Sequence, residues 1–256
     1  HINAHETGAL ESVGHKCLTL PTSNGKITAK QVDTLIQNHY NDINAEHTVQ
    51  PGIVYISFPT ESGTLYSKQE LTELYTVCQK HNIPLFIDGA RLGYGLMAKK
   101  NDVTFEDIAN LCDVFYIGGT KVGALFGECI VILNDLYKKD FRYSIKQHGG
   151  MLAKGRMLGI QFEELFKDNR YLTISKHAID MADLLTEGFQ SKGYRFYFPA
   201  ETNQLFPIFE NTKLEELSKE FAFTPWAKVD ETHTAVRFVT SFATKRENVE
   251  YLLTKI

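Results

Sequence analysis

A short apolar segment that ends in an aspartate places the strongest constraint on how this chain folds. Residues 85–88 (Leu-Phe-Ile-Asp) have the length and composition of a buried β-strand. Residues 113–117 (Asp-Val-Phe-Tyr-Ile) predict a second strand, which continues into Gly-Gly-Thr-Lys at residues 118–121. Open α/β sheets bind ligands at the carboxyl ends of their strands. We therefore expect Asp88 and Lys121 to lie at one ligand-binding edge.

Short strands and helices alternate through the first half of the chain. Residues 52–57 predict a strand, and residues 105–111 predict a helix. Two capping boxes, in which Thr28 and Ser67 each precede a Gln or Glu by three residues, predict two further helices. This alternation is typical of an α/β fold with a mostly parallel sheet and helices on both faces. The strand expected at 128–133 follows a short connection, which favours an antiparallel direction.

The second half of the chain has a different pattern. Residues 134–192 are predicted to be helical, with a break near the Gly-Gly pair at 149–150, and to include a long linking helix. After it we expect, in order, a strand at 194–198, a strand at 204–209, a helix capped by Thr212, a strand at 236–240 and a helix capped by Thr244. The pattern predicts a large domain over residues 1–166 and a smaller C-terminal α+β domain over residues 167–256.

The composition restricts the classes of partner. The formal net charge of −4 argues against the basic surface that nucleic-acid binding requires. No apolar segment is long enough to cross a membrane. The four cysteines form no CxxC pair, and no pair of histidines has metal-ligand spacing. We therefore expect free thiols, no metal site and a reducing, cytoplasmic compartment.

Lys121 and Asp88 offer the two groups that a pyridoxal 5′-phosphate (PLP) site requires. A lysine desolvated on a glycine-lined turn has a lowered pKa, and its amine forms a Schiff base with the cofactor aldehyde. An aspartate behind the ring keeps the pyridine nitrogen protonated, so that the ring acts as an electron sink. Taken singly, residues 118–121 equally fit a surface turn, and Asp88 equally fits an aspartate that caps a turn. The backbone N–H groups of residues 62–64, and those of residues 118–120, which end at Thr120, are candidates for a phosphate contact.

Two arginines are candidates for binding the carboxylate of an amino-acid substrate. Arg91 lies three residues after Asp88 and would border the same cavity, where its planar guanidinium suits a carboxylate. A salt bridge to a neighbouring acid is its alternative role. Arg237 lies between two bulky residues of the strand predicted at 236–240. An inward-facing Arg237 would require a bound anion, whereas on an edge strand it would face solvent.

Several segments in combination resemble the threonine aldolase family, also called the β-eliminating lyase or aromatic amino-acid lyase group. Its members are fold-type I PLP enzymes. The resemblance lies in Asp-Gly-Ala-Arg at 88–91 and Gly-Gly-Thr-Lys at 118–121. It extends to His-Ile and Glu-Thr-Gly-Ala within residues 1–9, to Pro-Thr-Glu-Ser-Gly-Thr-Leu-Tyr-Ser at 59–67 and to Arg-Phe-Val-Thr-Ser at 237–241. The match spans the whole chain.

The resemblance implies a role for each matched residue. Lys121 would carry PLP, and Asp88 would face the pyridine nitrogen. His1 would stack on the PLP ring, and Arg91 and Arg237 would hold the substrate carboxylate.

The resemblance also implies shared active sites. Lys146 and Lys154 lie where family members send cations to the cofactor phosphate of a neighbouring subunit. We therefore expect a homodimer or homotetramer, with a small amino acid as the other partner.

The chain departs from the family in two places. The best-studied branch has a histidine after the strand that ends here near Ser57, and this histidine helps to deprotonate the substrate hydroxyl. The loop at 58–64 has none, so the base would be Glu61, a water molecule or another group. The family also has an upstream segment with a phosphate-binding turn at a helix start. Because the sequence begins at His1, we expect the natural chain to start further upstream and a fragment without that segment to bind PLP poorly.

These inferences combine into one functional hypothesis. We expect a PLP-dependent aldolase that cleaves a β-hydroxy-α-amino acid, threonine or allo-threonine, to glycine and an aldehyde. The missing histidine keeps open a PLP-dependent β-eliminating lyase or an aminotransferase. A non-catalytic PLP-fold homologue is a further alternative.

Overall fold

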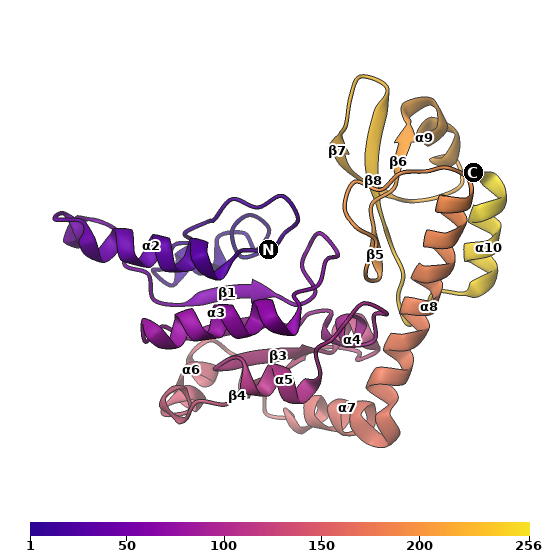
Figure 1. Cartoon of the computed structure of the whole chain (residues 1–256). Helices are drawn as coiled ribbons and strands as arrows, with labels where there is room; N and C mark the ends of the chain where they lie inside the picture. The colour runs from indigo at the N-terminus through magenta and orange to yellow at the C-terminus, as the bar shows by residue number, and fades with distance from the viewer.

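The structure, a computed structural model, describes residues 1–256 and contains two sheets joined by one long helix (Figure 1). The first sheet has four strands, which follow one another in chain order. Strands β1 (Val54–Ser57), β2 (Leu85–Asp88) and β3 (Val114–Gly118) are parallel, and β4 (Glu128–Ile132) runs antiparallel to β3. The mostly parallel sheet and its antiparallel fourth strand are therefore confirmed.

The helices of the first part begin where the capping patterns predict. Helices α2 (Ala29–Asn41) and α3 (Lys68–Lys80) each start with a complete capping box, formed by Thr28 with its N3 glutamine and by Ser67 with its N3 glutamate. Helix α5 (Phe105–Asn110) starts with a third box, which the sequence analysis did not identify. The helices that connect β1 to β2 and β2 to β3 thus both begin at a capping box, which involves only residues close in sequence.

One face of the first sheet carries the larger hydrophobic core. Because β1, β2 and β3 are joined in spatial order, right-handed crossovers bring α3 and α5 to the same face. The strand residues buried there are Val54, Ile56, Leu85, Ile87, Phe115 and Ile117. The opposite face carries Tyr55, Phe86 and Tyr116, which are half-buried.

Helix α8 (Arg170–Ser191) contributes to both hydrophobic cores. Tyr171 and Ile179 belong to the core of the first sheet, whereas Met181 and Phe189 belong to that of the second. Figure 1 shows α8 running from α7, below the first sheet, to α10 beside the second. The remaining helices before it are α1 (Ala9–Ser12), η1 (Ala45–His47), α4 (Leu92–Leu96), η2 (Thr120–Val122), η3 (Asp135–Tyr137), α6 (Phe141–Gln147), α7 (Arg156–Phe166) and η4 (Lys167–Asn169).

The second sheet is antiparallel and is built around β8 (His233–Val239). Three strands pair with it: β5 (Gln204–Leu205), β6 (Ile208–Glu210) and β7 (Thr224–Lys228). The strand predicted at 204–209 is therefore divided, because Pro207 has no N–H group to continue the pairing. The smaller α+β unit expected after the long helix is present.

One strand prediction in this part is wrong, and one strand was missed. Residues 194–198 form no strand and contribute a single bridge, between Phe196 and Pro207. Strand β7 was not predicted, because its residues are mostly exposed and include Pro225. Strand β7 lacks the regular alternation of buried and exposed residues that marks a half-buried strand.

The two helix caps predicted near the C-terminus are also wrong. Helix α9 (Asn211–Leu217) begins one residue before Thr212, which therefore lies inside its first turn. Helix α10 (Arg246–Lys255) has no side-chain cap, because the Thr244 hydroxyl accepts a hydrogen bond from the Ser241 N–H instead. No helix of the chain has both the length and the apolar character needed to cross a membrane.

Candidate active site

Asp88 ends strand β2 as a buried carboxylate surrounded by three donors. The Tyr55 hydroxyl donates to its Oδ2 over 2.6 Å, and the Ala90 N–H donates to its Oδ1 over 2.9 Å. The Tyr116 hydroxyl also donates to Oδ1. Burial, together with the charge of Asp88, raises the pKa of both tyrosines, so they stay protonated donors at neutral pH. A carboxylate has about four acceptor positions, so one remains for a ligand.

Lys121 lies one turn beyond β3, beside the turn that follows Asp88. The Gly118 N–H donates to the Gly89 carbonyl over 2.9 Å and joins the two turns. The Lys121 side chain is exposed, whereas a desolvated amine was expected. The short η2 turn accounts for this difference, because it buries Val122 and leaves the preceding lysine outside. The amine is therefore accessible at the ligand-binding edge.

Two arginines and one glutamate form a cluster near this edge. Arg91 Nη1 lies 4.0 Å from Glu61 Oε2, and the Arg91 side chain is 12% exposed. Burial lowers the pKa of Arg91, the charge of Glu61 opposes that shift, and the charge of Arg237 adds to it. Within this cluster two positive charges face one negative charge, and Asp88 is a further carboxylate near Arg91. The cluster would be balanced by an anionic ligand.

Arg237 projects from the central strand of the second sheet. Strand β8 has partners on both sides, so the edge-strand alternative does not apply. The Arg237 Nε atom is buried and has no hydrogen-bond partner in the chain. Its guanidinium lies 5.8 Å from the ring centre of Trp226. A ligand carboxylate would satisfy the buried donor.

His1 approaches the same glutamate from the beginning of the chain. His1 Nε2 lies 3.5 Å from Glu61 Oε2, and His1 Nδ1 lies 2.6 Å from Glu6 Oε1. The structure thus joins His1, Glu61 and Arg91, three residues predicted separately, into one series of contacts.

The loop that carries Glu61 is closed on itself. The Thr60 N–H donates to the Thr64 carbonyl over 3.0 Å, and the two threonine hydroxyls are 2.7 Å apart. Gly63 has a positive φ of 75°, and a Cβ there would lie 2.6 Å from the Gln204 carbonyl. The first residue of β5 therefore packs directly on this loop.

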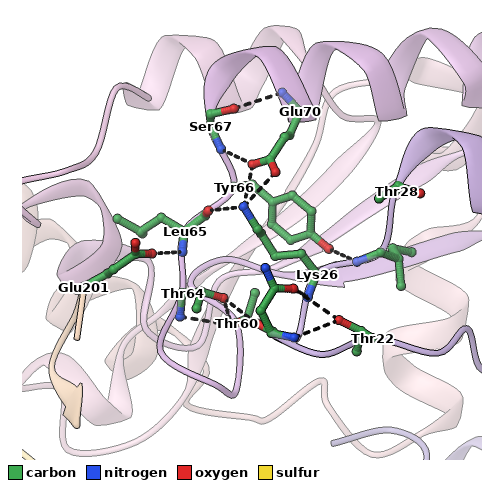
Figure 2. Close-up of polar contacts among 12 residues, drawn as sticks. Thr22, Lys26, Thr28, Thr60, Thr64, Leu65, Tyr66, Ser67, Glu70 and Glu201 are labelled. Atoms are coloured by element: carbon green, nitrogen blue, oxygen red, sulfur yellow. Dashed lines mark hydrogen bonds and ion pairs between the residues drawn. The ribbon is translucent and has the colours of Figure 1, made fainter. Parts of the chain in front are cut away.

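Charged side chains from distant segments hold the end of the same loop, as Figure 2 shows. Lys26 Nζ donates to the Leu65 carbonyl over 3.1 Å and to the Glu70 carboxylate over 2.7 Å. The Leu65 N–H donates to Glu201 over 3.1 Å. Sequence analysis missed Lys26 and Glu201, because their partners in the loop lie 39 and 136 residues away.

Three of the predicted cofactor residues are not brought into this cluster. Thr120 is exposed and its hydroxyl donates to the Gly127 carbonyl over 3.4 Å. Lys146, in α6, and Lys154, just before α7, are both exposed. No group of three or more His, Cys, Asp and Glu side chains is arranged to hold a metal ion.

The donors and acceptors of the site fit PLP together with an amino acid. Asp88 has an acceptor position left for a protonated ring nitrogen. Lys121 offers an accessible amine at the neighbouring strand end. The unpartnered Nε of Arg237 suits the carboxylate of an amino acid.

Residues 1–212 match the model of a known family, described as beta-eliminating lyase. The chain belongs to the β-eliminating lyase family. It is 32% identical over 223 residues to a low specificity L-threonine aldolase of a Pseudomonas species and 31% identical over 223 residues to the protein of that name from Pseudomonas aeruginosa. Each alignment covers 85% of this chain and 62% of the relative. The chain therefore spans less than two thirds of the length of these two relatives.

Solved structures agree with membership of the β-eliminating lyase family. Threonine aldolase from Leishmania major superposes with a TM-score of 0.95 at 43% identity, covering 99% of this chain and 73% of that one. A putative L-allo-threonine aldolase from Listeria monocytogenes has a TM-score of 0.72 at 20% identity, covering 100% of this chain and 73% of that one, and shows the fold alone. The predicted fold-type I architecture is confirmed.

Proposed function

We propose that this β-eliminating lyase family member is a PLP-dependent lyase that cleaves threonine or allo-threonine to glycine and acetaldehyde. The observation that carries the proposal is that Asp88 ends strand β2 and Lys121 lies just beyond the end of the adjacent parallel strand β3, with Arg91 and Arg237 close by. The activities in the names of the Pseudomonas and Leishmania relatives support it.

Asp88 and Lys121 are the residues that would hold the cofactor. Asp88 would face the ring nitrogen and keep its proton in place, while the Lys121 amine would be the attachment point for the aldehyde. PLP, when bound, supplies an electron sink for the bond that breaks. His1 would stack on the ring, and Thr120 would contact the phosphate.

Arg91, Arg237 and Glu61 act on the substrate. The two guanidinium groups would bind its carboxylate and fix the orientation of its Cα–Cβ bond. Glu61 Oε2, which faces both His1 and Arg91, would take the proton from the substrate hydroxyl as acetaldehyde leaves. A proton delivered to the α-carbon then completes glycine.

The proposal includes the organisation of the whole protein. Residues 1–166 form the PLP-binding domain and residues 167–256 form the small C-terminal domain. Two or four identical cytoplasmic chains assemble, and Lys146 and Lys154 reach the cofactor phosphate of a neighbouring copy.

Reductive trapping tests the assignment of Lys121. The chain is incubated with PLP, reduced with borohydride, digested and mapped by mass spectrometry, and acetaldehyde release from threonine is followed in parallel. The wild type is expected to carry the cofactor on Lys121. Lys121→Ala should lose both signals, whereas Lys139→Ala, at another exposed lysine, should keep both.

The products decide between the proposal and its alternatives. Release of 2-oxobutanoate with ammonia from threonine would indicate β-elimination, and a 2-oxo acid without ammonia would indicate amino-group transfer. Trapping without any turnover would support a non-catalytic PLP-binding protein. Trapping on a different lysine would contradict the role of Lys121.

A further inference from the structure

The loop that follows Lys121 is held against helix α7 by one side chain. Gln161 Oε1 accepts hydrogen bonds from the Leu125 N–H over 2.7 Å and from the Phe126 N–H over 3.3 Å. Gln161 Nε2 donates to the Phe126 carbonyl over 3.1 Å. A single amide group thus pairs with the backbone of two successive loop residues, in the way that a neighbouring strand would.

Side-chain packing contributes little to holding the part of the loop around Leu125 and Phe126. Leu125 is 85% exposed and Phe126 is 46% exposed, so neither anchors the backbone. The buried residue of the loop, Val122, lies in its first half. A hollow of about 340 Å³ lies between residues 123–125 and helix α7. The hydrogen bonds to Gln161 are therefore a main constraint on the second half of the loop.

Two glycines let the loop backbone approach the same helix. A Cβ on Gly127 would lie 2.1 Å from Leu158 Cδ2, and a Cβ on Gly119 would lie 2.7 Å from Phe162 Cζ. Leu158 and Phe162 are apolar neighbours of Gln161 along α7. Glycine at these positions leaves the loop with few side-chain contacts of its own, which increases its dependence on Gln161.

The beginning of the loop is fixed from other directions. The Tyr94 hydroxyl donates to the Lys121 carbonyl, and the Gly119 N–H donates to Glu128 over 2.6 Å. The Ala124 N–H also donates to the Gly119 carbonyl over 3.0 Å, which leaves the backbone of Leu125 and Phe126 to Gln161. Loss of the Gln161 contacts would let the backbone on the C-terminal side of Lys121 move.

We propose that Gln161 is a positioning residue, which holds the loop so that the Lys121 amine is presented to the cofactor aldehyde. This inference rests on the proposed function. Gln161 acts through the backbone of Leu125 and Phe126, with no contact to the cofactor or substrate.

Hydrogen exchange of the cofactor-free chain tests the positioning role directly. In Gln161→Leu the amides of Leu125 and Phe126 are expected to exchange about tenfold faster, since the side-chain oxygen that accepts from both is gone. Glu163→Ala, at an exposed residue of the same helix, should leave the loop unchanged. The conservative Gln161→Glu variant keeps an acceptor for Leu125 but loses the donor to Phe126 at neutral pH. Near pH 4 its carboxyl group regains a proton, so loop protection should recover.

The rate of reductive trapping then connects the loop to Lys121. We expect PLP to be trapped on Lys121 about tenfold more slowly in Gln161→Leu than in the wild type or in Glu163→Ala, a change of the size that lost hydrogen bonds produce. Unchanged trapping and unchanged exchange in Gln161→Leu would overturn the positioning role alone. Failure of the wild type to be trapped on Lys121 would instead overturn the proposed function, and with it this inference. A melting curve for each variant separates local loosening of the loop from loss of the fold.

Discussion

The Tyr55 hydroxyl donates a 2.6 Å hydrogen bond to the buried carboxylate of Asp88, across the pair of strands β1 and β2. The Tyr116 hydroxyl reaches the same carboxylate from β3, on its other side. The acid at the centre of the site is therefore oriented by both neighbouring strands, and its direction is set before any ligand binds.

Removal of the Tyr55 hydroxyl should destabilise the folded chain. We expect Tyr55→Phe to lower the free energy of unfolding by about 1.5–3 kcal/mol, the usual contribution of a hydrogen bond to a charged group. Urea unfolding at pH 7 measures the change. Tyr143→Phe is the matched control, because Tyr143 is 76% exposed, and its midpoint should not move. Equal midpoints for the Tyr55→Phe variant and the wild type would show that the bond contributes nothing.

Replacement of either candidate carboxylate-binding arginine by lysine should impair catalysis. Lysine keeps the charge of Arg91 or Arg237 but loses the planar pair of donors. We expect kcat/KM for threonine to fall by about 10–100-fold, mainly through KM, as for loss of a charged hydrogen bond. Steady-state kinetics of acetaldehyde release measure the effect, with Arg195→Lys, at an exposed arginine, as the control. A change of less than about twofold at both positions would exclude them from substrate binding.

The contact between Lys26 and Glu70 should support the Glu61 loop. The Lys26 side chain is 19% exposed and the Glu70 side chain is 40% exposed. This ion pair is therefore neither fully exposed nor fully buried. We expect Lys26→Met to lower the free energy of unfolding by about 1–3 kcal/mol, because Glu70 and the Leu65 carbonyl lose their donor.

A double-mutant cycle with Glu70→Gln tests whether this loss comes from the pair itself. The loss in free energy of unfolding for the double variant should be smaller than the sum of the losses for the two single variants. Lys138→Met, which breaks an exposed ion pair with Asp135, should have a smaller effect. Strict additivity in the cycle would assign the loss to something other than the Lys26–Glu70 contact.

Local patterns predicted the elements that build the first sheet. Thr28 and Ser67 predicted helix starts because a capping box involves neighbours in sequence. The strand ending at Asp88 and the turn with Lys121 were predictable because each is a short apolar segment next to a polar signal. The same kind of signal failed at Thr212, where the helix begins one residue earlier.

The assembly of the site was beyond local patterns. Glu61 meets His1 and Arg91 only in the folded chain, and Glu201 reaches the same loop from 136 residues away. The exposure of Lys121 depends on how η2 packs, which the Gly-Gly-Thr-Lys sequence does not determine. The role inferred for Gln161 depends on the placement of α7 beneath the loop, and a polar residue on a helix face carries no such signal.

The buried thiols Cys78 and Cys112 should make the fold sensitive to alkali. All four cysteines are free, and burial raises the pKa of these two thiols from 9.0 to about 12. In the unfolded chain they ionise near their ordinary value, so above pH 9 the unfolded state has lost protons that the folded state retains. The stability that the two protonated thiols contribute to the folded state is fully present below pH 9 and is lost as the pH rises toward 12. Each thiol should lower the free energy of unfolding by at most about 1.4 kcal/mol per pH unit in that window.

Urea unfolding under reducing conditions at several pH values between 8 and 11 checks this contribution. The double variant Cys78→Ala and Cys112→Ala is expected to be less stable at pH 8, because small cavities replace two buried sulfur atoms. Its stability should nevertheless fall less steeply with pH than that of the wild type. Ionisation of buried tyrosines such as Tyr94, whose pKa burial raises to about 12, affects both proteins equally and cancels in the comparison. Parallel pH curves for the two proteins would mean that the thiols titrate alike in the folded and unfolded states, contrary to their burial.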